Sequence, residues 1–162
     1  MTVALGVDVG GSSIKYAPVN MGAGKVLTEL GSVPTPPQAE AMLKSIAALA
    51  NALLPDGPVG IALPSVIQAG MVHTAAHLDP ALIGMNVEAA LRKRLGRTVT
   101  LLNDADAAGL AELRWGAARG VRGTVMVLTF GTGIGSALFT EGRLVPNTEL
   151  GHMEVDGYEG EQ

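Results

Sequence analysis

Asn103 and Asp104 are the residues in this sequence with the clearest capacity for chemistry. They follow an apolar run over 98–102 and precede a helical pattern over 107–115, where a strand is expected to end and a helix to begin. Side chains at that position of α/β proteins project into the ligand crevice. A carboxylate there can accept a proton from an alcohol while the amide binds a neighbouring hydroxyl, as phosphoryl transfer to a sugar requires. Helix capping is the competing interpretation, with Asn103 as the N-cap and Asp106 near the third helical position.

Two glycine-rich turns could bind phosphate. The first reads Gly-Gly-Ser-Ser over 10–13, and the second reads Gly-Thr-Gly over 131–133. Glycine lets backbone N–H groups approach an anion closely, and short hydroxyl side chains add hydrogen bonds. An ordinary hairpin turn is the alternative for each. Because 7–12 and 128–133 can be laid over each other without a gap, the matched pair favours the phosphate interpretation.

Asp8 places a carboxyl group in the otherwise apolar run 3–9. Burying that group is costly unless it has a partner, and a hydrated Mg²⁺ beside a phosphate would supply one. An ion pair with Lys15 is the alternative. Thr129 holds the corresponding position beside the second turn.

A third polar group lies toward the C-terminus and contains Glu149, His152 and Glu154, close to Asp156. One histidine without any cysteine gives poor support to a structural zinc site. Sugar-hydroxyl binding by Glu149 and His152 fits better, and a solvated loop is the alternative.

The elements that must position these residues follow from hydrophobic periodicity and from the glycine and proline breakers between the segments. Strands are expected over 3–9, 13–19, 25–33, 59–63, 98–102, 124–129 and 134–140, helices over 38–54, 87–95 and 107–115, and a hairpin around 68–70. After the connector 116–123 the opening β-meander begins a second time. The pattern predicts two related halves, the second of them incomplete.

Composition narrows the possible functions of the 162-residue chain, which is 48% hydrophobic but only 3% aromatic and has a formal charge of −4. An acidic chain without a basic block is not expected to bind nucleic acid non-specifically. The absence of cysteine removes disulfides, thiolate metal sites and cysteine nucleophiles. No apolar run approaches the ~20 residues that cross a bilayer, and the N-terminus does not resemble a secretory signal. We therefore expect a cytoplasmic protein without a membrane partner.

Four segments, 5–15, 102–108, 128–135 and 149–152, together resemble the ROK family of sugar kinases and repressors. The resemblance spans essentially the whole chain. Within the family, 103–111 and 146–157 look most like the polyphosphate glucokinases.

The resemblance implies an α/β actin-like ATPase (ribonuclease H-like) fold, with an N-terminal domain over 1–116 and the opening strands of a second domain over 117–162. It also implies a glucokinase that transfers a phosphoryl group from polyphosphate or ATP to the 6-hydroxyl of glucose, with Mg²⁺ held by Asp8 through water. Asp104 would be the general base. The implied sugar-binding residues are Asn103, Asp104, Glu149, His152 and Glu154, and the implied phosphate-binding residues are Asp8, Gly10, Gly11, Ser12, Ser13, Lys15, Thr129, Gly131, Thr132 and Gly133.

The sequence departs from the family pattern in three segments. Residues 153–156 replace the cysteine-rich zinc motif of many ROK kinases, so no structural zinc is expected. Residues 80–84 replace a more polar, tryptophan-containing segment of the polyphosphate-using relatives, and this bears on the choice of donor. The rest of the second domain is expected after Asp156, where the chain ends at Gln162, so a truncated form of a homodimeric kinase is implied.

Two other functions compete with a kinase. One is a truncated, non-catalytic sugar-binding fragment, motivated by the early end of the sequence. The other is a ROK-type sugar-responsive regulator, which requires an N-terminal helix-turn-helix, whereas the first strand is expected within a few residues of Met1.

Overall fold

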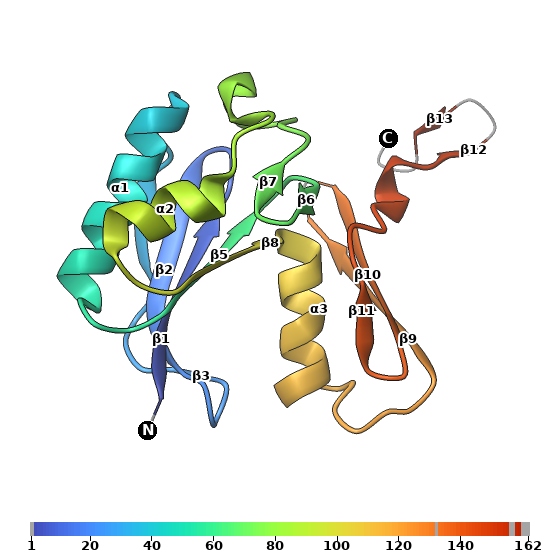
Figure 1. Ribbon diagram of the computed structural model, residues 1–162. Helices are drawn as coiled ribbons and strands as arrows, with labels where there is room; N and C mark the ends of the chain where they lie inside the picture. The colour runs from blue at the N-terminus through green and yellow to red at the C-terminus, as the bar shows by residue number, and fades with distance from the viewer. Residues whose placement is uncertain (1, 132, 156–157, 160–162) are drawn as a thin grey trace. The chain divides into compact units, whose positions relative to one another are not determined.

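The computed structural model describes residues 2–131, 133–155 and 158–159, and the chain divides into two compact units, 1–102 and 103–162 (Figure 1). The first unit contains β1 (Val3–Val9), β2 (Ser13–Asn20), β3 (Lys25–Val26), β4 (Gly31–Pro34), α1 (Ala39–Leu53), β5 (Val59–Leu63), β6 (Ile67–Gln68), β7 (Met71–Val72), the 3₁₀ helix η1 (Pro80–Leu82), α2 (Val87–Leu95) and β8 (Val99–Asn103). The second contains α3 (Asp104–Trp115), β9 (Thr124–Phe130), β10 (Ile134–Thr140), β11 (Arg143–Val145), η2 (Leu150–His152), β12 (Glu154–Val155) and β13 (Tyr158–Glu159). Among the described residues, no helix is both long and apolar enough to cross a membrane.

The sheet of the first unit has the order β3-β2-β1-β5-β8, with β4 also pairing with β2. Strand β1 pairs antiparallel with β2 and parallel with β5. The expected single strand over 25–33 is wrong, because it divides into β3 and β4. Two residues of β2, Ala17 and Pro18, lie between the positions that pair with β3 and those that pair with β4, and they face four residues, 27–30. The surplus residues leave the ladder beside Pro18, which has no N–H to donate.

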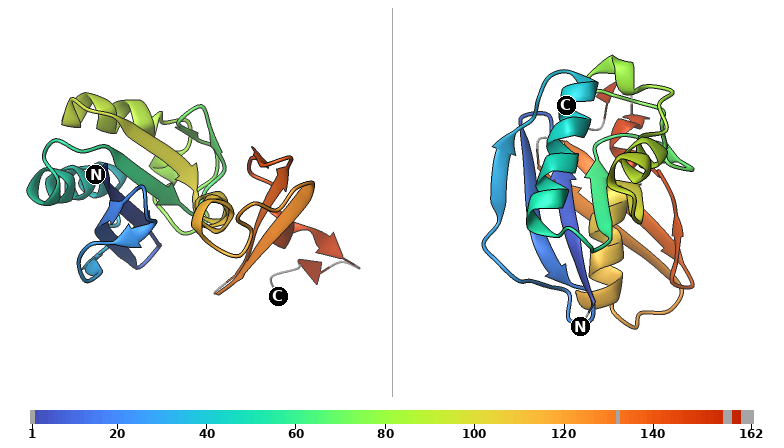
Figure 2. Two further views of the ribbon diagram at one scale, coloured as in Figure 1. Left: turned by 90° about the horizontal axis from the view of Figure 1, so that it is seen from below. Right: turned by 60° about the vertical axis from the view of Figure 1, so that its left-hand side comes forward.

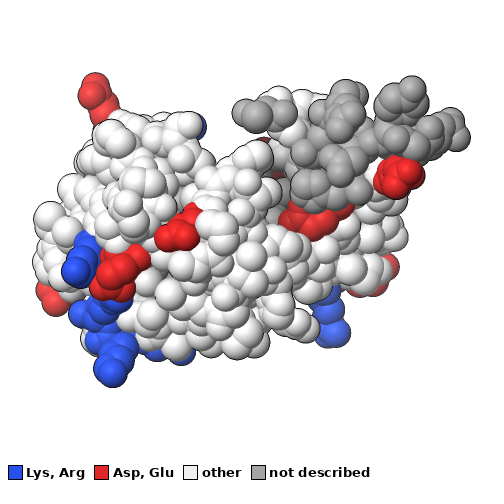
Figure 3. All heavy atoms as spheres, turned by 90° about the horizontal axis from the view of Figure 1, so that it is seen from above, with Lys and Arg blue, Asp and Glu red and all other residues white. Residues whose placement is uncertain are grey.

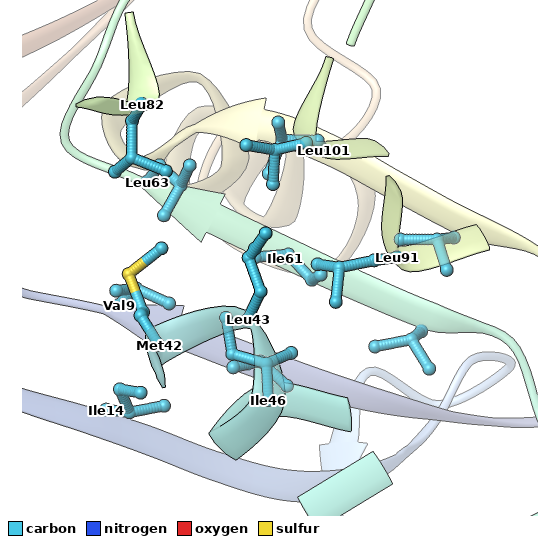
Figure 4. Close-up of a cluster of buried hydrophobic side chains, with 14 of the residues drawn as sticks. Val9, Ile14, Met42, Leu43, Ile46, Ile61, Leu63, Leu82, Leu91 and Leu101 are labelled. Carbon is cyan, nitrogen blue, oxygen red and sulfur yellow. The ribbon is translucent and has the colours of Figure 1, made fainter. Parts of the chain in front are cut away.

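Helices α1 and α2 cover the same face of this sheet, as the teal and yellow-green helices of Figure 2 show. On β1, Leu5, Val7 and Val9 are buried beneath them, whereas the alternating residue Asp8 is exposed. The period of two that defines a strand therefore separates the apolar core from the polar face. Figure 4 shows how α1 and α2 side chains meet those of β1, β2, β5 and β8 in this core. Each large side chain that is fully buried there contributes roughly 1.5–3 kcal/mol.

The expected helices over 38–54 and 87–95 are confirmed as α1 and α2, and Gly96 ends α2 in the left-handed conformation (φ 65°). Helix α3 begins at Asp104, three residues earlier than expected, because Asn103 caps it. The hairpin around 68–70 is confirmed by β6 and β7.

The outer strand β8 is bonded on one side by side chains of α2. Glu88 Oε2 accepts the backbone N–H of Leu101 (3.0 Å), and Arg92 donates to the carbonyl of Val99 (3.0 Å). Arg92 and Glu88 are also joined to each other at 2.6 Å. An ion pair on one helix turn thus satisfies a backbone donor and a backbone acceptor of β8.

Charged side chains are few and of mixed sign on the face drawn in Figure 3, where most of the surface is uncharged. The ion pairs found in the described part of the chain all involve α1 and α2: Lys44–Glu40, Arg92–Glu88 and Arg94–Glu40. The basic run 92–94 is therefore partly neutralised by carboxylates.

The second unit is built on the antiparallel sheet β11-β10-β9. Helix α3 packs on this sheet through Gly109, where an added Cβ would lie 2.5 Å from Ala137 Cβ and 2.9 Å from Phe139 Cε2. The other face of β9 exposes Met126, Leu128 and Phe130, the last at 77%. Because α3 packs on β10, it belongs to this unit. The boundary at 116/117 stays a prediction about the family's domains.

Candidate functional site

Asn103 occupies the junction between β8 and α3 and is only 4% exposed. Its Oδ1 accepts the N–H of Asp106 (3.0 Å), which is the hydrogen bond of an N-cap residue. Its Nδ2 donates to Glu149 Oε1 at 2.8 Å, across 46 residues of sequence. The capping interpretation is confirmed, and the same side chain also holds one of the expected sugar-binding residues.

Asp104 is the first residue of α3 and is exposed. Its Oδ1 accepts the N–H of Ala105 (2.8 Å). The positive end of the helix dipole favours the ionised carboxylate at this position. An exposed carboxylate beside two hydrogen-bonding side chains can accept a proton from a bound alcohol.

Glu149 lies in a segment whose backbone is unusual. Both Asn147 (φ 56°) and Glu149 (φ 43°) adopt the left-handed conformation, which residues other than glycine seldom adopt. Three hydrogen bonds to Ser136 and Asp106 hold this segment: Leu150 N–H to Ser136 Oγ (2.9 Å), Thr148 Oγ1 to the Ser136 carbonyl (3.1 Å) and Asn147 N–H to Asp106 Oδ2 (2.9 Å). The orientation of Glu149 therefore depends on tertiary contacts.

Asp106 is a functional candidate beyond the helix-terminal role that its position in the sequence predicts. It is 1% exposed, and burial raises the pKa of its carboxyl, an effect opposed by the Asn147 N–H and reinforced by the Asp104 carboxylate. Asp106 is three residues before Gly109 and so shares its face of the helix. The structure shows that this face packs against Ala137 and Phe139.

The first glycine turn joins β1 to β2 and is closed by the Gly10 N–H, which donates to the Ser13 carbonyl (2.9 Å). Thr35 supports it from β4's end: its Oγ1 donates to the Gly10 carbonyl (2.6 Å), and its N–H donates to the Ser12 carbonyl (3.0 Å). Gly11 lies against His77, where an added Cβ would be 3.0 Å from the His77 carbonyl oxygen. Gly11 and Ser12 are exposed at the tip, where an anion can reach them.

A cavity of ≈ 330 Å³ opens beside this turn within the first unit. Its lining includes Gly11, Thr35, His77 and Asp79. Both carboxylate oxygens of Asp79 are occupied, since Oδ2 accepts the Ala39 N–H (2.8 Å) and Oδ1 accepts the Ala81 N–H (3.0 Å). These bonds fix the loop before η1 to the start of α1 and lower the pKa of Asp79.

The second glycine turn joins β9 to β10, with the Gly131 N–H donating to the Gly133 carbonyl (3.0 Å). It is one residue shorter than the first, because Phe130 pairs with Ile134 whereas Val9 pairs with Ile14. Thr129 packs over Gly135, since an added Cβ there would collide with Thr129 Oγ1. Thr132 lies outside the described residues.

The surroundings of Asp8 indicate whether its carboxylate could bind Mg²⁺. It faces Lys15 in the β1–β2 register, but no ion pair joins them among the described residues, so the proposed alternative partner is not observed. On β5 its neighbour in register is the small residue Ala62, and Asp8 itself is exposed. Mg²⁺ commonly keeps several waters and binds one or two carboxylates together with substrate phosphates. A single accessible carboxylate next to a glycine turn fits that mode of binding.

The expected site residues therefore fall into groups within each unit. Asn103, Asp104 and Glu149 are brought together in the second unit, and Asp8, Lys15 and the first turn lie together in the first. Glu154 is exposed on β12, where it pairs in register with Glu159. The side chain of His152 and the residues Asp156 and Gly157 lie outside the described part of the chain. No cluster of three or more acidic or histidine side chains suited to a metal occurs among the described residues.

Comparison with known proteins gives a match to the ROK family over residues 4–162. The polyphosphate glucokinases of Mycobacterium leprae (strain TN) and Mycobacterium tuberculosis (strain H37Rv) are each 47% identical over 160 residues. The alignments cover 97% of this chain but only 49% and 60% of the two relatives. The chain thus spans about half to three-fifths of the length of these relatives.

Two solved structures show the same fold. An inorganic polyphosphate/ATP-glucomannokinase from Arthrobacter sp. strain KM matches with a TM-score of 0.90 and 46% identity, over 99% of this chain and 67% of the other. A ROK family glucokinase from Streptomyces griseus in complex with glucose and AMPPNP matches with a TM-score of 0.82 and 29% identity, over 94% of this chain and 51% of the other. The expected actin-like α/β fold is confirmed.

Proposed function

The chain belongs to the ROK family, and on that premise we propose that it carries the sugar-binding and phosphate-binding residues of a glucokinase. The reaction is transfer of a phosphoryl group from polyphosphate or ATP to the 6-hydroxyl of glucose. The observation that carries the proposal is the exposed Asp104 carboxylate beside the hydrogen-bonded pair Asn103–Glu149. The names of the two polyphosphate glucokinases and of the glucomannokinase support the same reaction class.

In the proposed reaction Asp104 accepts the proton of the glucose 6-hydroxyl as that oxygen bonds to the terminal phosphorus. The bond from phosphorus to the bridging oxygen of the donor breaks, and the shortened donor leaves with the electron pair. Asn103 and Glu149 hold neighbouring hydroxyl groups, and His152 and Glu154 are further candidates for that role. Little covalent chemistry is required, because positioning and charge neutralisation supply most of the acceleration.

Phosphate binding is assigned in the proposal to the two glycine turns. Each turn, 10–13 in the first unit and 129–133 in the second, would bind phosphate through its own backbone N–H groups and hydroxyls, and Lys15 would contribute a positive charge beside the first. Mg²⁺, held by Asp8 through water, would neutralise charge on the transferred group. Cytoplasmic location and a homodimer of the whole protein belong to the same proposal.

The test is the Asp104→Asn variant, assayed for glucose phosphorylation with polyphosphate and with ATP in parallel. Loss of a general base is expected to lower kcat by about 10²- to 10⁴-fold, while glucose affinity measured by calorimetry changes little. Asp56→Asn, the same substitution at an exposed loop carboxylate, is the matched control and should retain full turnover.

Undiminished turnover in Asp104→Asn would refute the assigned base. Glucose binding by the unaltered chain without turnover from either donor would support the sugar-binding fragment instead. The ratio of the rates with polyphosphate and with ATP shows which donor is preferred, the property that the departure at residues 80–84 leaves open.

A further inference from the structure

A closed circuit of hydrogen bonds connects the start of α3 to the segment that carries Glu149. Asp106 N–H donates to Asn103 Oδ1 (3.0 Å), and Asn103 Nδ2 donates to Glu149 Oε1 (2.8 Å). Two residues before Glu149, the N–H of Asn147 donates to Asp106 Oδ2 (2.9 Å). The backbone from Asn147 to Glu149 completes the circuit. Asp106 therefore takes part in this circuit twice, through its backbone N–H and through its carboxylate.

The segment held by this circuit needs external support. Glu149 adopts the left-handed conformation although it is neither glycine nor asparagine, so the local backbone conformation is unfavourable by itself, whereas Asn147 tolerates this conformation better. Such conformations persist where surrounding contacts fix them. Ser136 fixes one side of the segment through Leu150 and Thr148, and Asp106 fixes the other side through Asn147.

The environment of Asp106 is unusual for a residue whose only task is to stabilise a helix start. A first-turn acidic residue gains from the helix dipole while remaining in water. Asp106 is instead 1% exposed, and its Oδ1 has no hydrogen-bond partner in the described part of the structure. Capping the helix does not require burial of the Asp106 carboxylate, since Asn103 already provides the cap. The buried carboxylate is explained by its bond to Asn147.

We propose that Asp106 is a positioning residue that orients Glu149 for sugar binding by holding the Asn147 N–H from inside the second unit. The sugar in this inference comes from the proposed function, whereas the hydrogen bonds of the circuit do not depend on that function. Asp106 does not touch the substrate in this scheme. It acts through Asn147 on the backbone conformation of Glu149, and through Asn103 on the Glu149 carboxylate.

The first test uses the unaltered 162-residue chain. Titration of the Asp106 carboxyl is followed by its ¹³Cγ shift in NMR spectra, with Asp104 and Glu149 assigned in the same series because both lie near it. The ¹H and ¹⁵N shifts of the Asn147 amide should move with the Asp106 midpoint. An Asn147 amide that follows only Asp104 or Glu149, or that does not move, would overturn the proposal.

The second test compares Asp106→Leu with Asp106→Asn, which keeps an oxygen acceptor of nearly the same shape. In Asp106→Leu, hydrogen exchange of the Asn147 amide should accelerate about tenfold or more, as expected when a bond to a charged acceptor is lost. The dissociation constant for glucose should weaken by a similar factor. Asp106→Asn should recover most of both properties, because its carbonyl oxygen can accept the same N–H.

Phe139→Leu is the control for general loosening of the packing between α3 and β10, since it removes buried volume opposite Gly109 without forcing α3 away from the sheet. It should lower stability while leaving Asn147 exchange and glucose affinity close to those of the unaltered chain. A loss of glucose affinity in Phe139→Leu equal to that in Asp106→Leu would refute the positioning role. If the unaltered chain binds no glucose, the proposed function fails, whereas the Asn147 measurements still decide the role of Asp106.

Discussion

Replacing Asn103 with Asp isolates one hydrogen bond of the site. Aspartate caps helices about as well as asparagine, so the bond from Asp106 N–H to the residue 103 side chain is kept. The substitution instead removes the amide donor that lies 2.8 Å from Glu149 Oε1 and places a second carboxylate there. The site is 4% exposed, so water cannot screen the pair effectively.

The magnitude has a lower and an upper bound. Loss of a hydrogen bond to a charged acceptor costs about 1.5–3 kcal/mol. Repulsion between the two carboxylates cannot cost more than protonating one of them, which at pH 7 is about 3.7 kcal/mol for a group of ordinary pKa near 4.3. We expect Asn103→Asp to lower the free energy of unfolding by about 2–4 kcal/mol at pH 7.

The same reasoning fixes the pH dependence. Two carboxyl groups at hydrogen-bond distance share one proton, and the shared pKa rises above that of an isolated glutamate. The penalty should therefore shrink as the pH is lowered from 7 toward about 4.5, where one group is protonated at little cost and can donate to the other.

Urea unfolding followed by circular dichroism measures the effect, and fluorescence of Trp115, the single tryptophan of the sequence, reports on α3. The matched control is Asn86→Asp at the N-cap of α2, where the amide donates to the neutral Ala69 carbonyl in an exposed position. Its effect should be smaller. Equal stability of Asn103→Asp and the unaltered chain at pH 7, or a penalty that grows on acidification, would contradict the reasoning.

Two further predictions concern the first unit. Gly11→Ala should displace the first glycine turn, because its new Cβ would meet the His77 carbonyl oxygen at 3.0 Å and His77 Cβ at 3.1 Å. Calorimetry with polyphosphate should show weaker binding than that of Gly60→Ala, a position on β5 that has no atom within 4 Å and no positive φ. Asp79→Ala should destabilise the chain near neutral pH by removing acceptors for Ala39 and Ala81. Since these bonds lower the folded-state pKa of Asp79, the part of its contribution that depends on ionisation is complete above the ordinary aspartate pKa of about 4 and is lost as the pH falls through the lowered value, so urea unfolding should show a larger difference at pH 7 than in acid.

The regular elements could be predicted from the sequence because their hydrophobic periods are clear. Helix α1 buries Met42, Leu43 and Ile46 at helical spacing, and β1 buries alternate residues from Leu5 to Val9. The division between β3 and β4 could not be read from composition, because it depends on the register of both strands against β2 at Pro18. The apolar content of this segment is compatible with one long strand as well as with two short ones.

The candidate site was predictable where a local sequence motif contains it. Asn103 and Asp104 occupy a strand-to-helix junction, and Glu149 could be named as polar in a weakly structured stretch. The bond between Asn103 and Glu149 spans 46 residues and has no local signal. The sequence predicts only that Asp106 lies near the third position of a capped helix, because its burial depends on a segment 41 residues away. Long-range partners decide which polar residues of a motif are accessible and which are enclosed.

The bonds that Glu88 and Arg92 make to β8 have a consequence for self-association. An outer strand with free backbone groups is a template on which another chain can add a strand, and aggregation often begins in this way. Here a side chain from α2 already occupies the Leu101 N–H, and another occupies the Val99 carbonyl. An incoming strand would have to displace an ion pair before it could form the same bonds. The two residues therefore protect these positions of the sheet edge from intermolecular β-pairing in the folded state.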